Sequence, residues 1–405
     1  MNSMTFEQVA AVMNEIQAQA TGQKSIAITD TSSFVSVGTT LLKTGMDPIM
    51  GAISQVLSRT IFSVRPYSRK FKGLEVSETA FGNHVRKLSI ADKPIREDER
   101  FLWPVGLDGA PAQEPGSPVI GDGYSVDMYK LNKPDVLQTN FYGNSVFEDF
   151  YTMFRDQLTA AFKDPSEMGR FVSMVVQNMS DKLENYRENF ARALLANYIG
   201  AIRSENNPDR NIHLLTEYNT QTGESYTVED IYHPDKFPAF MRWALAYVQT
   251  VSAKMTERTE LFQTVINSKH IIRHTPKADQ RFFFYAPYQY QIDANALSVT
   301  FNDGKVPALP ITETVNFWQS IETPDTVKVK AARVNSSGIE VAEEVTVENV
   351  FGILFDREGA SYATTQQWSA PTPFNAAGGY SNIFFHETEK MWNDLTEKAV
   401  LFTLD

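Results

Sequence analysis

The sequence contains no cysteine among its 405 residues. Disulfide bonds, thiolate metal ligands and a cysteine nucleophile are therefore excluded. It also contains no run of about eighteen apolar residues, which is the least that a bilayer-spanning helix needs. Its beginning, MNSMTFEQVAAVMNEIQAQA, lacks the basic region and the apolar block of a secretory signal. These absences predict a soluble protein that is made in a cytoplasm and has no membrane contact.

Basic charge is scarce as well. Thirty-seven Lys and Arg stand against 49 Asp and Glu, so the formal net charge is −12. Tight and extensive binding of nucleic acid depends on neutralising phosphates with cationic side chains, and this balance argues against it. The charge does not exclude a surface that only faces nucleic acid across solvent. The hydrophobic content of 42% is ample for a folded protein, and the length predicts two or three structural regions.

Familiar catalytic and nucleotide-binding signatures are missing too. There is no G-x-S-x-G elbow, no G-x-G-x-x-G fingerprint and no P-loop. The small-residue knot AAGG at Ala376 to Gly379 is not followed by the Lys and Ser or Thr of a phosphate loop. Pro371 and Pro373 favour an extended approach to the knot. We interpret it as a bend between two packed strands, with Trp368 and Phe374 burying apolar area on its two sides, rather than as a ligand cradle.

The histidines offer one candidate metal pair. His270 and His274 are four residues apart, which would place two imidazoles on one face of a helix. Pro276 follows closely, Ile271 stands where a zinc protease has its Glu, and no third ligand is indicated. We therefore favour a turn histidine beside a core histidine, and we expect no metal and no cofactor.

Carboxylate pairs are easy to find in so acidic a chain, and two of them are Asp230 with Asp235 and Glu387 with Glu389. Two carboxylates can share acid–base work only when their environments separate their pKa values. Because the sequence does not reveal such environments, surface pairs are the default interpretation. No catalytic, cofactor-binding or metal-binding residue is assigned, and no enzyme activity is expected.

Six aromatic residues lie between Phe282 and Tyr290, in QRFFFYAPYQYQIDANAL. Such a cluster can stack on single-stranded bases, but only Arg281 is basic nearby, so core or interface packing is favoured. The mixed charge run from Arg96 to Arg100 is a solvated loop or a contact with a neighbouring subunit.

Three regions are expected before residue 165. Phe6, Val9, Met13 and Ile16 form one apolar stripe, which predicts a short N-terminal helix that must pack on something. A mixed segment follows, and residues 65 to about 143 predict a long β-hairpin arm. Its tip, residues 103–123, holds four prolines and five glycines and must be extended. An insertion of this size is usually functional or contacts another molecule.

The clearest element begins at Pro165, which Asp164 can cap. Apolar residues recur every three or four positions to Ile202, and Gly200 with the Asn-Asn-Pro at 206–208 marks the end. A helix of 39 residues would be about 58 Å long at 1.5 Å per residue. The alternative is two shorter helices that join near residues 177–178.

The same stripe gives a facing for the helix. Phe190 lies in the middle of the stripe, so Phe190→Asp should abolish soluble protein. Arg187 and Glu188 lie off the stripe, so Glu188→Lys should be mild.

The remaining chain predicts a mixed domain. The expected helices are residues 237–253 and 257–267, and the expected strands are 326–334 and 340–350, joined by a turn at 335–338, and 350–355. The ending, 383–405, is expected to form a strand, a short helix around Trp392 and a second strand.

Six phrases, spread over nearly the whole chain, resemble those of major capsid proteins from tailed phages and prophages of gut bacteria. They are ISQVLSRTIFSVRPYSRKFKGLEV (53–76), NKPDVLQTNFYG (132–143), HLLTEYN (213–219), RHTPKADQR (273–281), ETVNFWQSI (313–321) and QWSAPTPFNAAGGY (367–380). The specificity of the resemblance comes from the order of all six phrases together, because no single phrase is specific. The resemblance implies an α+β, Hong Kong 97-like capsid fold with a long spine helix, an extended β-hairpin arm and a mixed α/β axial domain.

The resemblance also implies a division of the chain. The regions are an N-terminal arm (1–60), an extended β-hairpin loop (61–145), a peripheral domain with the spine helix (146–225), an axial domain (226–370) and return strands of the peripheral domain (371–405). Some relatives cross-link subunits through Lys and Asn. The arm contains Lys70, Lys72, Lys87 and Lys93, but nothing identifies their partners, so no cross-link is assigned.

The implied function is a structural major capsid protein that self-assembles, as hexamers and pentamers, into an icosahedral shell around double-stranded phage DNA. DNA would line the inner face without sequence-specific binding, and a separate scaffold, a portal and decoration proteins are possible partners. The protein would belong to the virion and be made in the cytoplasm of a bacterial host. The alternatives are an encapsulin-like compartment shell and a soluble enzyme with an unfamiliar site, which would need a deep pocket with convergent polar groups.

Overall fold

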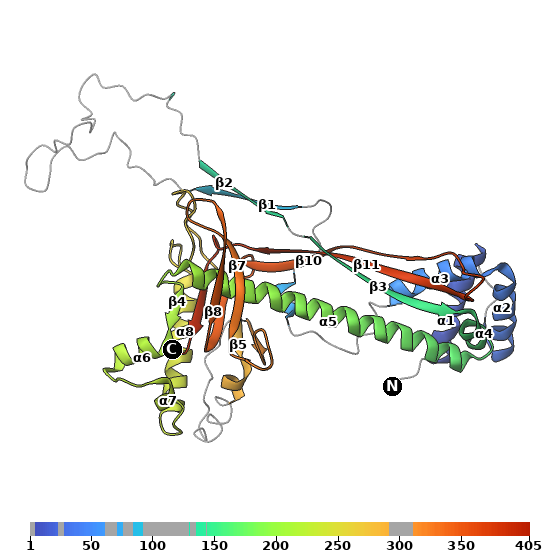
Figure 1. Cartoon of the computed structure of the whole chain (residues 1–405), viewed down its shortest axis with the longest axis horizontal. Coiled ribbons are helices and arrows are strands. Elements are labelled where there is room, and N and C mark those ends of the chain that lie inside the picture. The colour runs from blue at the N-terminus through green and yellow to red at the C-terminus, as the bar shows by residue number, and fades with distance from the viewer. Residues whose placement is uncertain are drawn as a thin grey trace, which may run out of the picture.

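The computed structural model describes residues 5–22, 28–60, 71–75, 84–91, 129, 135–142, 144–290 and 311–405. The predicted extended tip at 103–123 and the charge run at 96–100 lie outside these residues. Figure 1 shows a compact domain at one end of the molecule and a long arm at the other, with one helix running through both. None of the helices in the described part of the chain combines the length and the apolar character that a membrane crossing requires.

Short helices form the far end of the arm (Figure 1). They are α1 (Phe6–Thr21), α2 (Thr31–Thr44), α3 (Met46–Thr60) and α4 (Arg155–Ala161). The predicted N-terminal stripe is confirmed, because Val9, Met13 and Ile16 are buried. Thr5 accepts a hydrogen bond from the Gln8 backbone, which caps the start of α1. The mixed segment after it consists of two further helices.

The long helix α5 (Pro165–Glu205) has 41 residues, so it is about 62 Å long. The prediction of one helix rather than two is confirmed. The Asp164 side chain accepts from Ser166 N at 2.9 Å, and Asn206 ends the helix in the left-handed conformation. Gly200, however, lies inside the helix rather than at its end. Strand β7 (Val327–Val334) crosses so closely there that a Cβ on Gly200 would overlap Val329.

A three-stranded antiparallel sheet follows α5 along the arm, in the order β10-β11-β3. Its strands are β3 (Asn144–Phe154), β10 (Ala360–Pro371) and β11 (Tyr380–Asn393). The AAGG knot is the turn between β10 and β11, and Gly379 has a φ of 67°, so the predicted bend is confirmed. The predicted helix around Trp392 is wrong, because Trp392 pairs with Ser361 within the sheet.

The compact domain contains a five-stranded sheet in the order β4-β12-β9-β5-β6. Its strands are β4 (Asn211–His213), β5 (Gln280–Tyr285), β6 (Ile311–Val315), β9 (Val350–Asp356) and β12 (Ala399–Thr403). The β12–β4 and β5–β6 pairs are parallel and the other pairs are antiparallel. Every residue of β9 and β12 is buried, as continuous apolar runs require.

Three helices and a hairpin complete the compact domain. They are α6 (Leu214–Thr222), α7 (Val228–Ile231), α8 (Phe237–Met255) and the antiparallel pair of β7 with β8 (Glu340–Val347). The predicted hairpin and the predicted helix at 237–253 are confirmed. The predicted helix at 257–267 is wrong, because Phe262 and Asn267 have φ values of 70° and 52° and the segment forms turns and isolated bridges. Helical spacing of apolar residues was misleading there.

Buried apolar side chains form two large clusters. One, the distal core, joins α1 to α4 with the first half of α5 and with Ile383 and Phe385 of β11. The other, the main core, joins the second half of α5 with α8 and the five-stranded sheet. The aromatic run contributes to the main core, because Phe282, Phe283 and Phe284 are fully buried there. Core packing of that run is therefore confirmed.

A two-stranded antiparallel ribbon leaves the junction of arm and compact domain (Figure 1). It consists of β1 (His84–Ala91) and β2 (Asp135–Tyr142), and the short 3-10 turn η1 (Lys72–Leu74) precedes it. Both strands fall within the predicted arm.

Candidate functional site

The candidate histidines do not share a helix face. His270 and His274 lie on irregular backbone rather than on a helix, and His270 Nδ1 lies 2.9 Å from Glu260 Oε1. Across the residues that the structure describes, no three His, Asp or Glu side chains are grouped as metal ligands. The helical spacing of these two residues therefore has no counterpart in the fold.

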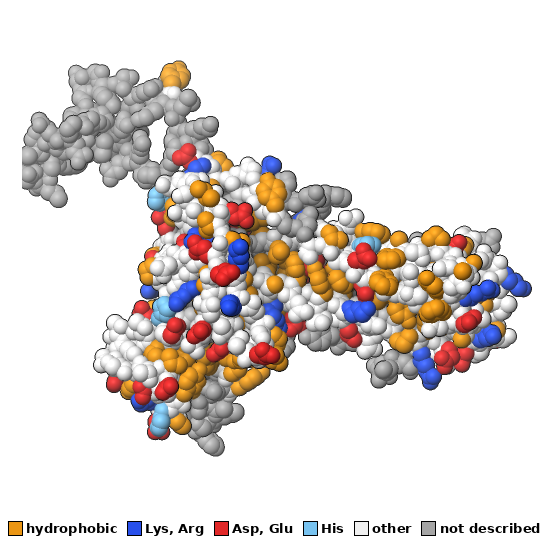
Figure 2. Space-filling model, in the orientation of Figure 1, with side chains coloured by type: hydrophobic (Ala, Val, Ile, Leu, Met, Phe, Trp, Pro, Cys, Tyr) orange, Lys and Arg blue, Asp and Glu red, His pale blue; other side chains and the backbone are white. Residues whose placement is uncertain are grey.

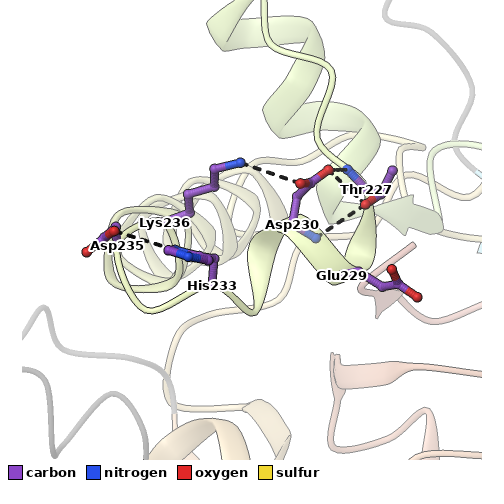
Figure 3. A pocket seen from close by; sticks show the side chains of 6 residues that line it. All are labelled: Thr227, Glu229, Asp230, His233, Asp235 and Lys236. Carbon is purple, nitrogen blue, oxygen red and sulfur yellow. Dashed lines mark hydrogen bonds and ion pairs between the residues drawn. The ribbon is translucent and has the colours of Figure 1, made fainter.

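Asp230 and Asp235 lie on opposite sides of a hollow of about 370 Å³ beside α7 (Figure 3). Asp230 Oδ2 accepts from Thr227 N at 2.9 Å and from its hydroxyl at 2.8 Å. These hydrogen bonds lower the pKa of Asp230 and make it part of a helix cap. Asp235 pairs at 3.5 Å with His233, and Lys236 lies 3.6 Å from Asp230. The two carboxylates thus have separate partners.

Glu387 and Glu389 are the opposite of a surface pair. Both side chains are 0% exposed and face α5 from β11. Arg187 Nε donates to Glu387 Oε1 at 2.7 Å and to Glu389 Oε1 at 3.3 Å. Burial, and then the neighbouring Glu387, raises the pKa of Glu389 to about 8. The surface interpretation of this pair is wrong, because period-two alternation places both residues on the face that Ile383 and Phe385 bury.

The predicted facing of α5 also needs correction. Arg187 and Glu188 are both only 7% exposed, and Glu188 Oε1 accepts from Arg192 at 2.9 Å. Phe190 is half-buried, with its ring edge-to-face against Tyr362 at 5.9 Å. Glu188→Lys can therefore not be mild, because it would leave Arg192 and the new ammonium together in a dry site.

The ribbon is fastened to the compact domain by buried charge. Lys87 Nζ lies 3.0 Å from Asp394 Oδ2 and 3.4 Å from Glu358 Oε2, and it also pairs with Glu397. Arg273 pairs with Glu397 as well. Burial opposes the charged form of Lys87, but these carboxylates outweigh it, so its pKa is raised. Lys87 thus has partners in its own chain. The side chains of the other three arm lysines lie outside the described residues.

A cleft of about 510 Å³ lies between β2, α5, the β7–β8 hairpin and the end of β11. An enzyme would direct free polar groups into such a space, but the polar groups here hold backbone. Asn197 Oδ1 accepts from Ala332 N at 3.0 Å, and Arg333 Nη2 donates to Ser204 O at 3.2 Å. These hydrogen bonds fasten the β7–β8 hairpin to α5.

The sheet of the arm has a second face, directed away from α5, which we call the outer sheet face. It consists of Val146, Glu148, Phe150, Phe154, Trp368, Tyr380, Phe384 and His386. Val146 is 66% exposed and Phe150 56%. Trp368 stacks on His386 at 4.0 Å but remains 46% exposed, so the prediction that it would be buried is wrong. Figure 2 shows hydrophobic side chains along the arm, between the compact domain and the charged far end.

The ribbon has a comparable face, which we call the outer ribbon face. It consists of Arg86, Leu88, Ile90 and Val136, because alternate residues of each strand point the same way. Leu88 and Ile90 are each 63% exposed. Two contiguous apolar faces on one chain are typical of a subunit that is covered by other molecules.

Comparison with known proteins agrees with that interpretation. The model of the Phi29-like phage major capsid protein family matches residues 9–403. The chain belongs to this family. The match confirms the resemblance found in the sequence. This capsid protein is therefore a structural component of a phage shell, and the family match does not favour the encapsulin alternative.

Solved structures show the same fold at low sequence identity. The capsid structure of Staphylococcus phage Andhra is 12% identical, with 84% of each chain covered and a TM-score of 0.50. A chain in the structure of the head fiber and inner core protein gp22 of native bacteriophage P68 has 10% sequence identity and a TM-score of 0.51, with 84% of this chain and 85% of that chain covered. No curated protein sequence matches. The predicted Hong Kong 97-like α+β fold is confirmed.

For a capsid protein the functional parts are contact faces and the groups that hold them in place. Sequence reasoning missed Arg187 and both outer faces. The alternation of Val146, Glu148 and Phe150 was a usable signal, because β3 would expose all three on one side. Nothing comparable marks Arg187, whose buried partners Glu387 and Glu389 are about 200 residues away.

Proposed function

We propose that this capsid protein assembles, as pentamers and hexamers, into an icosahedral shell around double-stranded DNA. The family match over residues 9–403 carries the proposal. Packaged DNA would face the inner surface without sequence-specific contacts, in keeping with the net charge of −12. The shell would be built in the cytoplasm of a bacterial host with a portal, decoration proteins and a separate scaffold or none, and the protein would have no enzyme activity.

We further propose that the chain divides as the resemblance implies. The parts are 1–60 as N-terminal arm, 61–145 as extended loop, 146–225 and 371–405 as peripheral domain, and 226–370 as axial domain. Buried side chains link these parts: the distal core joins the N-terminal arm with the peripheral domain, and the main core joins the axial domain with residues 191–215 and 395–404 of the peripheral domain.

The outer ribbon face of one copy would lie on the outer sheet face of the next. Both faces are apolar, and their exposed charges are complementary, with Arg86 on the ribbon and Glu148 on the sheet. Leu88 and Ile90 would cover Phe150, which removes exposed apolar surface from both copies. Since an exposed pair is worth at most about 1 kcal/mol, apolar contact supplies the affinity and the charges set the register.

A charge exchange tests this contact. Arg86→Glu or Glu148→Arg alone should lower the yield of shells, counted by electron microscopy, at least tenfold. The double variant should recover most of it. Glu322→Arg, at an exposed position on another surface, should assemble normally. Failure of the double variant to recover, with all variants folded, would reject the pairing of these two faces.

A further inference from the structure

The two cores are separated by a polar cross-section of the arm. On α5, Leu183 is the last residue buried in the distal core and Ala191 is the first in the main core. On β11, Phe385 belongs to the distal core, and no later residue of that strand does. Arg187 and the two glutamates opposite it lie in this gap, beside the stacked rings of Phe147, Tyr186 and Phe190. The arm thus has an apolar core on each side of the section and buried charge within it.

The charges in the section do not balance. One guanidinium, that of Arg187, faces Glu387 and Glu389 on β11 and Glu184 on its own helix, whose Oε1 lies 3.6 Å from Nη1. Gln367 of β10 donates to Glu387 Oε2 at 2.6 Å. Glu389 Oε2 is buried with no hydrogen-bond partner among the described residues.

Neighbouring elements add no compensating charge among the described side chains. Opposite Glu389 and Glu387, β3 contributes Ser145 and Phe147, which are neutral and contact Tyr186. His386 follows the alternation of β11 and lies on its other face. Lys390 is buried as well, but the parity of the strand directs it to that other face, away from Glu389.

One arginine can compensate one buried carboxylate, and a second carboxylate at the same site avoids ionisation by keeping its proton. In that state one carboxyl group donates to the other, and the pair carries a single negative charge against Arg187. The raised pKa of Glu389, about 8, agrees with this state. Loss of the proton places two negative charges in a section that has no solvent to screen them.

We propose that this section is a proton-controlled hinge of the arm: while the Glu387–Glu389 pair holds one proton, α5 stays fastened to β11 and the two cores remain in line. When the proton leaves to solvent, repulsion between the glutamates opens the contact. The distal core then bends against the main core about residues 184–190. The hinge requires no contact with a neighbour, so it is independent of the proposed pairing of the outer faces.

The sign of the pH effect follows from linkage. The folded-state pKa of Glu389, about 8, lies above the ordinary value of 4.5, so the folded protein holds a proton that the unfolded chain releases. Its contribution to stability is fully present below pH 4.5 and is lost as the pH rises through about 8. Alkaline conditions should therefore open the hinge.

Hydrogen exchange on the full chain tests the hinge. Between pH 6 and pH 9, after correction for intrinsic exchange, amides of residues 184–190 should exchange at least tenfold faster in the wild type. Glu389→Gln keeps the shape and removes the titration, so it should show no such increase. Glu148→Gln, on the opposite face of the sheet, should behave like the wild type. An equal increase in wild type and Glu389→Gln would overturn the proposal.

Infrared spectroscopy gives an independent readout. The wild type should lose one protonated carboxyl band between pH 6 and pH 9, and Glu389→Gln should lack that loss. If Glu389→Gln fails to fold, Glu387→Gln takes its place, since it leaves a single carboxylate for Arg187. Persistence of the band in the wild type at pH 9 would also reject the hinge.

Discussion

The two sheets of this capsid protein bury their side chains in opposite ways. In the compact domain, β9 and β12 are buried at every residue, so both faces of the sheet are covered by the chain itself. In the arm, most residues of β3 and β11 that face α5 are buried or half-buried, and large side chains such as Phe150 remain exposed on the other side. The compact domain is therefore covered within one subunit, whereas the sheet of the arm has an apolar face that, in our proposal, a neighbour covers.

The largest effects are expected from replacing one aromatic residue in each sheet by aspartate. The replacement in the compact domain should prevent folding, and the one in the arm should prevent assembly only. Phe283 is fully buried and stacks against Phe71 and Phe355 at 5.7 Å. Phe283→Asp removes the ring and buries an unpaired carboxylate, which should cost about 5 kcal/mol or more and abolish soluble protein.

Phe150→Asp is the matched variant on the outer sheet face. Because Phe150 is 56% exposed, the free subunit should lose no more than about 1 kcal/mol of stability, while shells should fail to form. Melting curves and particle counts measure the two effects. If Phe150→Asp unfolded the subunit, or assembled normally, the contrast between the two sheets would be wrong.

Buried and exposed ion pairs on α5 should differ in the same way. Glu188→Lys breaks the buried pair with Arg192 and adds a like charge, which should destabilise the subunit by about 3–5 kcal/mol. Lys182→Glu affects a pair with Asp149 whose lysine is 51% exposed, so its cost should stay near 1 kcal/mol. Denaturant unfolding of both variants provides the comparison, and equal midpoints would contradict the assigned facing of the helix.

Gly200 tests how closely the β7–β8 hairpin packs on the spine helix. Gly200→Ala would normally favour a helix, but here the added Cβ overlaps Val329 and Ala331 of β7. We expect a loss of about 1–3 kcal/mol in the free energy of unfolding. Gly51→Ala in α3 meets no atom within 4 Å and should be neutral or stabilising. If both substitutions raised the free energy of unfolding, the hairpin would move away from Gly200 at little cost, and the close packing would be wrong.

The smallest effect is expected at the turn of the arm. Gly379 has a positive φ of 67° and open space around it, so Gly379→Ala meets backbone strain but no clash and should cost about 1–2 kcal/mol. Phosphate, nucleotide and divalent metals should leave the melting temperature of wild type and variant unchanged. A gain of several degrees that only the wild type shows would make the turn a binding site after all.

Much of this architecture can be predicted from local chemistry. Asp164, Pro165 and the residues around Asn206 give both ends of the spine helix, because caps and helix breakers act within a few residues. The turn from Asn335 to Gly338 is equally local: Gly338 N donates to Asn335 O at 2.9 Å, and Gly338 has a φ of 75°.

What local chemistry cannot give are features that depend on distant partners. Gly200 resembles a helix end until β7 is known to cross it, and Arg187 resembles a surface residue until β11 brings two glutamates to it. The exposed side of β3 is ambiguous for the same reason, since the partner that would cover it belongs to another molecule. Glu387 and Glu389 are an intermediate case, because strand alternation alone would have placed them inside.

Hydrogen exchange in free subunits and in assembled shells tests the central claim most directly. Arg155 N donates to Gly379 O at 2.9 Å, and this fixes which residues of β3 bond to β11. The alternate amides, from Val146 to Phe154, face the open edge of the sheet. We predict that amides of β3 become at least tenfold more protected on assembly, while those of β9, already covered within the subunit, do not change. Equal protection of β3 in both states would contradict the account of the arm as a surface completed by a neighbour.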